Sequence, residues 1–277
     1  MSSKNVFLYK DYFKTLNKQN IIYHNPNYQL FISPPFSNYQ SILKNLYNIP
    51  SSTIYIKGSY TLEPRSGLVG QVLKTLRYSF AAGGWVNKIG LRNPGIDKAI
   101  QENYVNLSKK ERTKVITSIA ILDIEEIPKF EKKLINDMNI EINVSCPNVE
   151  HKLISSGLST LLNPHRAWCI IKLSPITTFQ EIDEYYNQGF RQFHCSNTLP
   201  IANGGLSGPS LQPYTSRLVA YISKSYPDCQ IIAGGGIQNI KDIDNYRQKN
   251  VIGYSISTIL FNPWKTYLLF DSLNNFN

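Results

Sequence analysis

Eight short apolar runs recur along the chain, and this repetition strongly limits the folds open to it. Most runs lie about 20 to 40 residues apart, with helix-like or turn-like segments between them. Such alternation predicts an α/β protein, a single (β/α)8 (TIM) barrel rather than an open sheet, and about 250 residues is the usual size of that fold. The predicted strands are residues 28–33, 52–56, 118–122, 140–144, 169–173, 190–195, 230–233 and 251–256.

The segments between the strands complete the expected organisation. One domain is predicted over residues 1–277, with residues 1–27 as an N-terminal extension. Residues 59–95 form a long insertion after the second strand, rich in Gly and Pro, and loops of this length are usually functional. Helical spacing of apolar residues predicts helices at 38–46, 94–104, 127–137, 179–187, 210–225 and 240–248.

Composition excludes several classes of protein. The net charge of +10 is spread along the 277 residues without a strong cluster, so we expect no nucleic-acid partner, although a basic surface could attract an anionic substrate. Neither a membrane helix nor a signal peptide is visible, so a soluble, cytoplasmic protein without membrane contact is expected. The four cysteines form no C-x-x-C pair, so the chain is not expected to carry a metal or an iron–sulfur site.

Function in such barrels gathers where strands end. The run at 140–144 ends in Ser145, Cys146, Pro147 and Asn148, which places a thiol beside an amide at a strand end. A lone cysteine in this position is more often a small core residue than a reactive group, so the other strand ends must decide between the two readings.

Glycine and hydroxyl residues suggest a phosphate site. Gly234, Gly235 and Gly236 follow the seventh predicted strand, and Ser257 and Thr258 follow the eighth. These loops commonly bind phosphate on backbone N–H groups, which only glycine allows an anion to approach closely. A simple Gly turn is the alternative, but Ser207 and Gly208 after the sixth strand favour a cofactor that carries a phosphate.

Two lysines follow apolar runs, Lys57 after the second strand and Lys172 within the fifth. A single lysine of this kind is usually a solvated strand end. Because buried lysine is rare without an anion, the pair predicts two ammonium groups in the barrel mouth that share an anionic ligand.

Seven colinear motifs at strand ends and loops together resemble the class 1 dihydroorotate dehydrogenases. Each motif alone is weak to moderate, but their common order from about residue 28 to residue 265 is specific. The motifs lie at residues 61–65 (TLEPR), 87–95 (NKIGLRNPG), 143–148 (NVSCPN), 172–175 (KLSP), 197–199 (NTL), 204–209 (GGLSGP) and 234–237 (GGGI).

The resemblance implies a barrel that holds FMN at the carboxyl-end face of its strands and oxidises (S)-dihydroorotate to orotate in pyrimidine biosynthesis. In that family the residue matching Cys146 is the general base that removes the C5 proton, while hydride passes from C6 to flavin N5. A thiol suits a base near neutral to mildly alkaline pH. Lys57 resembles a catalytic lysine near both flavin and substrate.

Further roles carry over residue by residue from the resemblance. Amides suit the substrate because each supplies a donor and an acceptor for its alternating C=O and N–H edge. The residues implied for the cofactor are Lys57, Asn143, Lys172, Gly208, Gly235, Gly236, Ser257 and Thr258. Those implied for the substrate are Lys57, Asn87, Gly90, Leu91, Asn143, Asn148, Asn197 and Thr198.

The branch within class 1 bears on the partner. Residues 62–65, the glycines before Asn87 and residues 261–263 are more similar to the NAD-linked 1B branch than to the fumarate-using branch. The resemblance therefore implies a homodimer that works with an iron–sulfur flavoprotein electron-transfer subunit.

Several departures from the family keep alternatives open. The chain is shorter than usual between Asn148 and Lys172 and between Asn197 and Gly205. Pro34-Pro35 stands where the family has small residues under the flavin, and Ser257 stands where it has a glycine near the phosphate. A shortened lid can admit water or change substrate choice. An FMN oxidoreductase acting on another dihydropyrimidine-like substrate, or a diverged non-catalytic flavin-binding barrel, are therefore the alternatives.

Overall fold

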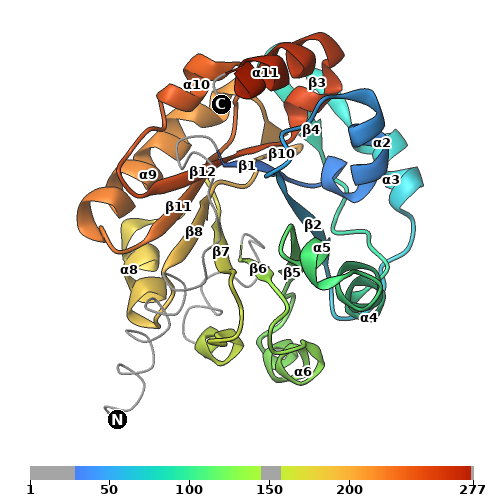
Figure 1. Cartoon of the computed structure of the whole chain (residues 1–277), viewed down its shortest axis with the longest axis vertical. Coiled ribbons are helices and arrows are strands. Elements are labelled where there is room, and N and C mark those ends of the chain that lie inside the picture. Colours follow the sequence, from blue (N-terminus) through green and yellow to red (C-terminus); the bar gives the residue numbers. More distant parts are fainter. Residues whose placement is uncertain (1–28, 145–156, 276–277) are drawn as a thin grey trace.

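The computed structural model describes residues 29–144 and 157–275, and its centre is a closed barrel of eight parallel strands (Figure 1). The order around the barrel is β1-β12-β11-β8-β7-β6-β5-β2, which confirms the predicted (β/α)8 fold. The barrel strands are β1 (Leu30–Ile32), β2 (Ile54–Tyr60), β5 (Val115–Ala120), β6 (Ile140–Asn143), β7 (Cys169–Leu173), β8 (Gln192–Cys195), β11 (Gln230–Gly234) and β12 (Val251–Ile256).

Helices and single helical turns cover the outside of the barrel. Local sequence explains where some begin: the Thr178 hydroxyl accepts from the Glu181 N–H and the Glu181 carboxylate accepts from the Thr178 N–H, which caps α8 from both sides. The helical elements are η1 (Phe36–Tyr39), α2 (Gln40–Leu46), α4 (Ile96–Ile100), η2 (Gln101–Val105), α5 (Lys109–Arg112), η3 (Ile124–Glu126), α6 (Ile127–Lys133), η4 (Leu158–Leu161), α8 (Phe179–Asn187), η5 (Pro209–Leu211), α9 (Gln212–Ser225), α10 (Ile240–Asp244), η6 (Thr258–Phe261) and α11 (Pro263–Asn275).

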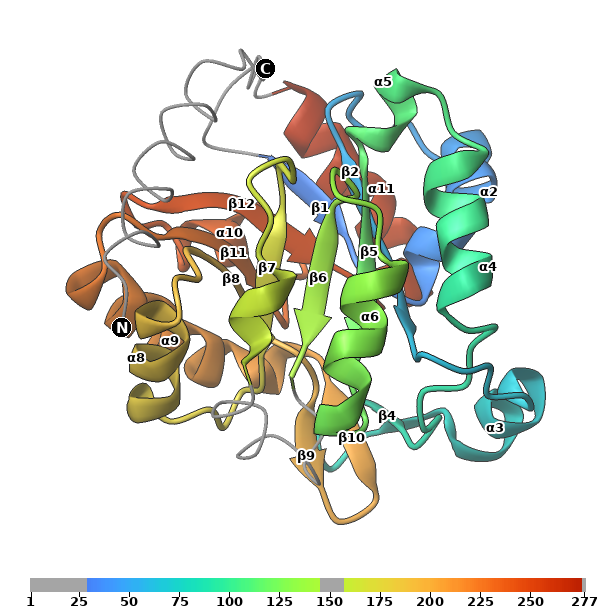
Figure 2. The same ribbon diagram turned by 90° about the horizontal axis from the view of Figure 1, so that it is seen from below.

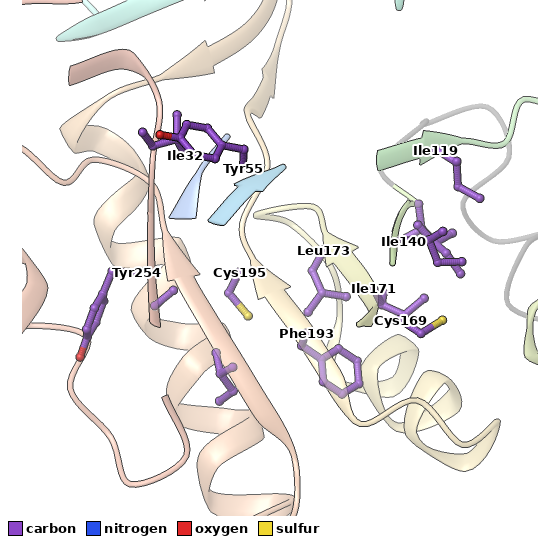
Figure 3. Close-up of a cluster of buried hydrophobic side chains, with 14 of the residues drawn as sticks. Ile32, Tyr55, Ile119, Ile140, Cys169, Ile171, Leu173, Phe193, Cys195 and Tyr254 are labelled. Atoms are coloured by element: carbon purple, nitrogen blue, oxygen red, sulfur yellow. The ribbon is translucent and has the colours of Figure 1, made fainter. Parts of the chain in front are cut away.

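Alternation along the strands divides the apolar core into two layers. The outer layer packs between strands and helices and includes Leu173 of β7 and Phe193 and Cys195 of β8 (Figure 3). The inner cluster fills the barrel near the amino ends of the strands and consists of Phe31, Ile54, Ile56, Ile116, Trp168, Ile170 and Ile232. Further along the same strands the inward positions become polar, so the carboxyl end of the barrel has a polar floor.

A second, antiparallel sheet lies beyond the carboxyl end of the barrel. Its order is β3-β4-β10-β9, and it joins the insertion after β2 to the crossover after β8. Figure 2 shows β4, β9 and β10 beyond the tip of β6. The strands are β3 (Arg77–Ser79), β4 (Gly84–Asn87), β9 (Leu199–Ile201) and β10 (Gly204–Ser207), and helix α3 (Leu68–Thr75) precedes them.

Several predicted boundaries were wrong. Strand β5 begins at Val115 rather than Ser118, and it includes the polar Thr117 and Ser118, which are buried with their hydroxyls hydrogen-bonded to Asn103 and Glu141. Strand β2 continues beyond Lys57 to Tyr60. The predicted helix at 94–104 changes to π geometry after Ile100, those at 127–137 and 240–248 end early, and α11 was not predicted.

The predicted N-terminal extension, residues 1–27, lies outside the described residues. Within the described ranges, no helix has both the length and the apolar character needed to cross a membrane.

Candidate functional site

A cavity of about 420 Å³ opens at the carboxyl ends of the barrel strands. This volume is in the range of small-molecule and cofactor sites. Strands β7, β8, β11 and β12 contribute its floor, and α3 and β4 contribute its far wall. It brings together most of the predicted site residues: Asn87, Lys172, Asn197, Thr198, Gly208, Gly235, Gly236, Ser257 and Thr258.

The floor is a cluster of buried charged and polar groups. The Lys172 ammonium lies 3.6 Å from Glu141 Oε1, and His194 Nδ1 lies 2.6 Å from Glu141 Oε2. The Ser118 hydroxyl donates to Glu141 Oε1 across 2.7 Å. Both carboxylate oxygens are therefore engaged inside the barrel, where Glu141 is fully buried.

These contacts determine the charges of the cluster. Burial opposes ionisation of Glu141, but Lys172, His194 and the hydrogen bonds outweigh it and lower its pKa to about 2. Burial lowers the pKa of His194, and although Glu141 opposes this shift, Lys172 reinforces it. At neutral pH the cluster therefore holds an ionised carboxylate, an ammonium group and a neutral imidazole.

Glycines bring two loops of the cavity into close contact. A Cβ on Gly236 would lie 2.8 Å from the Gly208 carbonyl oxygen, and one on Gly235 would lie 3.1 Å from the Thr215 hydroxyl. Both glycines also have positive φ, 111° at Gly235 and 77° at Gly236. Close packing thus requires glycine here, and the phosphate role of these residues stays a prediction.

Two of the predicted amides are held in one orientation. Asn197 Nδ2 donates to Asn143 Oδ1 across 3.1 Å, and Asn143 Nδ2 donates to the Ser59 hydroxyl across 3.0 Å. The backbone N–H of Thr198 donates to Asn197 Oδ1. This series of hydrogen bonds fixes the orientation of both side-chain amides, and therefore which side of each is the donor and which is the acceptor.

Lys57 does not face the barrel mouth, and that prediction was wrong. Lys57 pairs in register with Thr117, whose hydroxyl accepts from Asn103 of η2 in the helical layer. Burial lowers the pKa of Lys57, with Glu102 of η2 opposing and Lys44 of α2 reinforcing the shift. Because strand side chains alternate and the preceding Ile56 belongs to the inner cluster, the Lys57 ammonium group lies on the helical side of β2, away from the cavity.

Apolar side chains form the opposite wall. Leu68, Val69, Val72, Leu73 and Leu76, on or directly after α3, line the cavity. An aromatic group continues this wall: the Phe261 ring lies 4.3 Å from the Trp85 ring and 4.7 Å from the Phe36 ring, centroid to centroid. The cavity is therefore polar at its floor and apolar at its far wall.

Six predicted residues are not among those that line the cavity: Lys57 and Asn143, described above, and Gly90, Leu91, Cys146 and Asn148. Gly90 and Leu91 lie in the loop after β4, where both have positive φ. Cys146 and Asn148 lie outside the described residues.

Glu141 and His194 were missed by the reading of the sequence. A signal existed, because each stands inside an apolar run predicted as a barrel strand, Ile140-Glu141-Ile142 and Phe193-His194-Cys195. A charged or titratable residue inside a strand that is buried on both faces needs a buried partner.

A barrel with a polar ligand floor at its carboxyl end, covered by loops and a second sheet, defines a (β/α)8-barrel protein that binds small molecules or cofactors. The particular family follows from comparison with known proteins. The family model for dihydroorotate dehydrogenase matches residues 23–248, and the chain belongs to this family of oxidoreductases. Its class 1 members are FMN-dependent flavoproteins, in agreement with the predicted cofactor.

Curated relatives confirm the predicted branch. Two proteins named dihydroorotate dehydrogenase B (NAD(+)), catalytic subunit, are each 31% identical to the chain. The one from Petrotoga mobilis matches over 73% of this chain and 75% of its own length, and the one from Desulforamulus reducens over 80% of each.

A solved structure supports the fold. The crystal structure of dihydroorotate dehydrogenase from Eimeria tenella in complex with ferulenol superimposes with a TM-score of 0.65 over 98% of this chain and 91% of that chain, at 14% identity.

Proposed function

We propose that the protein oxidises (S)-dihydroorotate to orotate with FMN as cofactor. The observation that carries this proposal is the meeting of Lys172, Asn197 and the glycine loop in one cavity, within a chain of the dihydroorotate dehydrogenase family. When bound, FMN supplies the acceptor, its N5 atom, for the hydride that leaves C6 of the substrate.

The residues present fit this cofactor. The Lys172 ammonium in the floor suits the electron-rich pyrimidine end of a flavin, because a cation there favours the anionic reduced form. The Gly208, Gly235 and Gly236 backbone and the Ser257 and Thr258 residues would hold the ribityl phosphate. The Ser257 hydroxyl donates to the Pro34 carbonyl, so Thr258 is the hydroxyl better placed to donate to a phosphate.

Side-chain amides would bind the substrate through hydrogen bonds. Asn87 and Asn197 line the cavity, and Asn143 fixes the orientation of Asn197. Thr198, Asn148 and the loop at Gly90 and Leu91 complete the proposed set. Each amide offers a donor and an acceptor, which matches a ring whose edge alternates C=O and N–H groups.

Cys146 is the proposed base that removes the C5 proton of dihydroorotate. A thiol with a pKa near 8.5 is partly thiolate at mildly alkaline pH, so it can accept a proton there. Lys57 has no part in this proposal, because its side chain faces the helical layer.

Electrons are proposed to leave through a separate iron–sulfur flavoprotein subunit. The relatives carry the name of a catalytic subunit of an NAD(+) enzyme. The described cysteines Cys169, Cys195 and Cys229 are buried and free, and in the described part of the chain no three metal-ligating residues gather. A homodimer of this chain is part of the same proposal.

Product analysis tests the proposed substrate. The purified protein, supplied with FMN, dihydroorotate and an artificial acceptor that takes two electrons, is expected to form orotate in an amount equal to the acceptor reduced. Dihydrouracil, which lacks the carboxylate, serves as the comparison. Turnover of dihydrouracil without turnover of dihydroorotate would support the alternative, an oxidoreductase for another dihydropyrimidine.

A further inference from the structure

We propose that His194 contacts the ligand directly: Glu141 holds its Nδ1–H, and Nε2 accepts a hydrogen bond from the imide N3–H of the bound flavin ring. This inference rests on the proposed function, because it takes FMN as the ligand of the cavity. The flavin ring would then contact His194 as well as Lys172. Glu141, which contacts both side chains, would position them.

The first observation concerns the Nδ1 side of the ring. His194 Nδ1 and Glu141 Oε2 are 2.6 Å apart, and both side chains are almost completely buried. An ionised carboxylate can only accept hydrogen bonds, so Nδ1 must carry the hydrogen. A neutral imidazole then has no hydrogen on Nε2, and this atom is an acceptor.

The second observation concerns the Nε2 side. His194 lines the cavity, and Nε2 lies 3.4 Å from the position that a Cβ on Gly234 would occupy. Among residues 29–144 and 157–275, no hydrogen-bond partner is found for Nε2. His194 is only 1% exposed, and Nε2 is not among the fully buried atoms without a partner in the described residues, so this acceptor opens onto the cavity, where a donor on a ligand can meet it.

The third observation concerns the spacing of donor and acceptor. Lys172 and His194 are register partners on the adjacent strands β7 and β8 and face the same cavity. An ammonium group beside a ring nitrogen acceptor matches a ligand edge in which a carbonyl oxygen lies next to an N–H group.

Both the flavin pyrimidine ring and the dihydroorotate ring have such an edge. We commit to the flavin, because Lys172, the register partner of His194, is the residue proposed for the pyrimidine end of the flavin. The experiment must therefore distinguish a contact of Nε2 with the flavin from a contact with the substrate ring.

The test compares FMN with 3-methyl-FMN, in which a methyl group replaces the N3 hydrogen. The full chain, stripped of flavin, is titrated with each compound, and quenching of flavin fluorescence gives the dissociation constants. Wild type is expected to bind FMN about tenfold more tightly than the analogue, the effect of one hydrogen bond.

The variant His194→Asn isolates Nε2. The Asn amide can still donate to Glu141 in place of Nδ1, but it has no atom at the Nε2 position. We expect about tenfold weaker FMN binding and loss of the preference over 3-methyl-FMN. The exposed His165 provides the matched control, and His165→Ala should keep both wild-type values.

Wild type that binds the two flavins equally would overturn the proposal, and so would a His194→Asn variant that keeps the wild-type preference. Weaker orotate binding in His194→Asn with unchanged flavin binding would assign the contact to the substrate and would also overturn it. If the variant does not fold, the ¹⁵N NMR signals of His194 in wild type decide, because a hydrogen on Nε2 contradicts the proposal. Wild type that takes up no FMN at all would instead refute the proposed function.

Discussion

Glu141 and His194 meet inside the barrel, with the carboxylate Oε2 atom 2.6 Å from the ring Nδ1 atom. Their strands, β6 and β8, flank β7, which carries Lys172 with its ammonium 3.6 Å from Glu141 Oε1. The Lys172 ammonium group in the cavity floor is thereby paired with the buried Glu141 carboxylate. The barrel can thus present a lysine to a ligand without leaving its charge unpaired in an apolar interior.

Replacing Glu141 with Gln is expected to destabilise the protein strongly. The variant leaves the buried Lys172 ammonium without its counter-ion, and breaking a buried pair in this way costs about 3–5 kcal/mol. Urea unfolding followed by circular dichroism measures the loss. The matched control is Asp97→Asn, which breaks the exposed pair with Lys133 and should cost less than about 1 kcal/mol. Equal losses in the two variants would contradict the structural role of Glu141.

Stability is expected to fall as the pH is lowered from 7 to 3. The folded state lowers the pKa of Glu141 to about 2 and also lowers the pKa of His194. The unfolded chain therefore binds more protons, first on the histidine below about pH 6.5 and then on the carboxylate below about pH 4.3. Urea unfolding at several pH values should show less loss in Glu141→Gln below pH 5 than in wild type. The same pH dependence in both proteins would argue against an ionised, buried Glu141.

Thr258→Val is expected to weaken FMN binding and leave riboflavin binding unchanged. The Thr258 side chain lines the cavity beside the glycine loop, and valine keeps its shape without the hydroxyl. Loss of one hydrogen bond to a charged phosphate should raise the dissociation constant for FMN by about tenfold to a hundredfold. Fluorescence titration with both flavins provides the measurement, and riboflavin, which lacks the phosphate, is the internal control. An equal effect on both flavins would place the phosphate elsewhere.

Cys146→Ala is expected to slow reduction of the bound flavin by dihydroorotate by about 10² to 10⁴, the usual contribution of a general base. FMN should stay bound, and chemical reduction with dithionite should proceed as in wild type. Stopped-flow absorbance without oxygen measures the rates. Unchanged reduction by dihydroorotate in this variant would remove Cys146 from the mechanism.

The barrel itself could be predicted from the sequence, because the apolar run that indicates a strand recurs eight times along the chain. Strand β7 has the predicted bounds, and its apolar outward residues and inward Lys172 follow from simple alternation. The orientation of Lys57 was predicted wrongly, because the second strand was predicted to end at Ile56, with Lys57 in the barrel mouth. The strand continues through Lys57 to Tyr60, and because Ile54 and Ile56 point into the barrel, alternation directs Lys57 outward.

Site residues at strand ends could be predicted from the sequence, whereas a buried pair that depends on contact between distant strands was missed. Lys172, Asn197 and the glycine loop were predicted from their positions at strand ends, and the structure brings them together. Glu141 and His194 lie 53 residues apart in the sequence, and their contact exists only because β6, β7 and β8 are neighbours. The cavity wall formed by α3 was also missed, although Leu68, Val69, Val72, Leu73 and Leu76 recur at helical spacing within the insertion.

The most direct test of the proposed function is an absorbance spectrum recorded without oxygen. The purified protein is loaded with FMN, freed of excess flavin and mixed with (S)-dihydroorotate. We predict that the yellow colour of the bound flavin bleaches and that one orotate forms for each flavin reduced. A protein that holds FMN but stays yellow with dihydroorotate, or one that cannot take up FMN, would contradict the account.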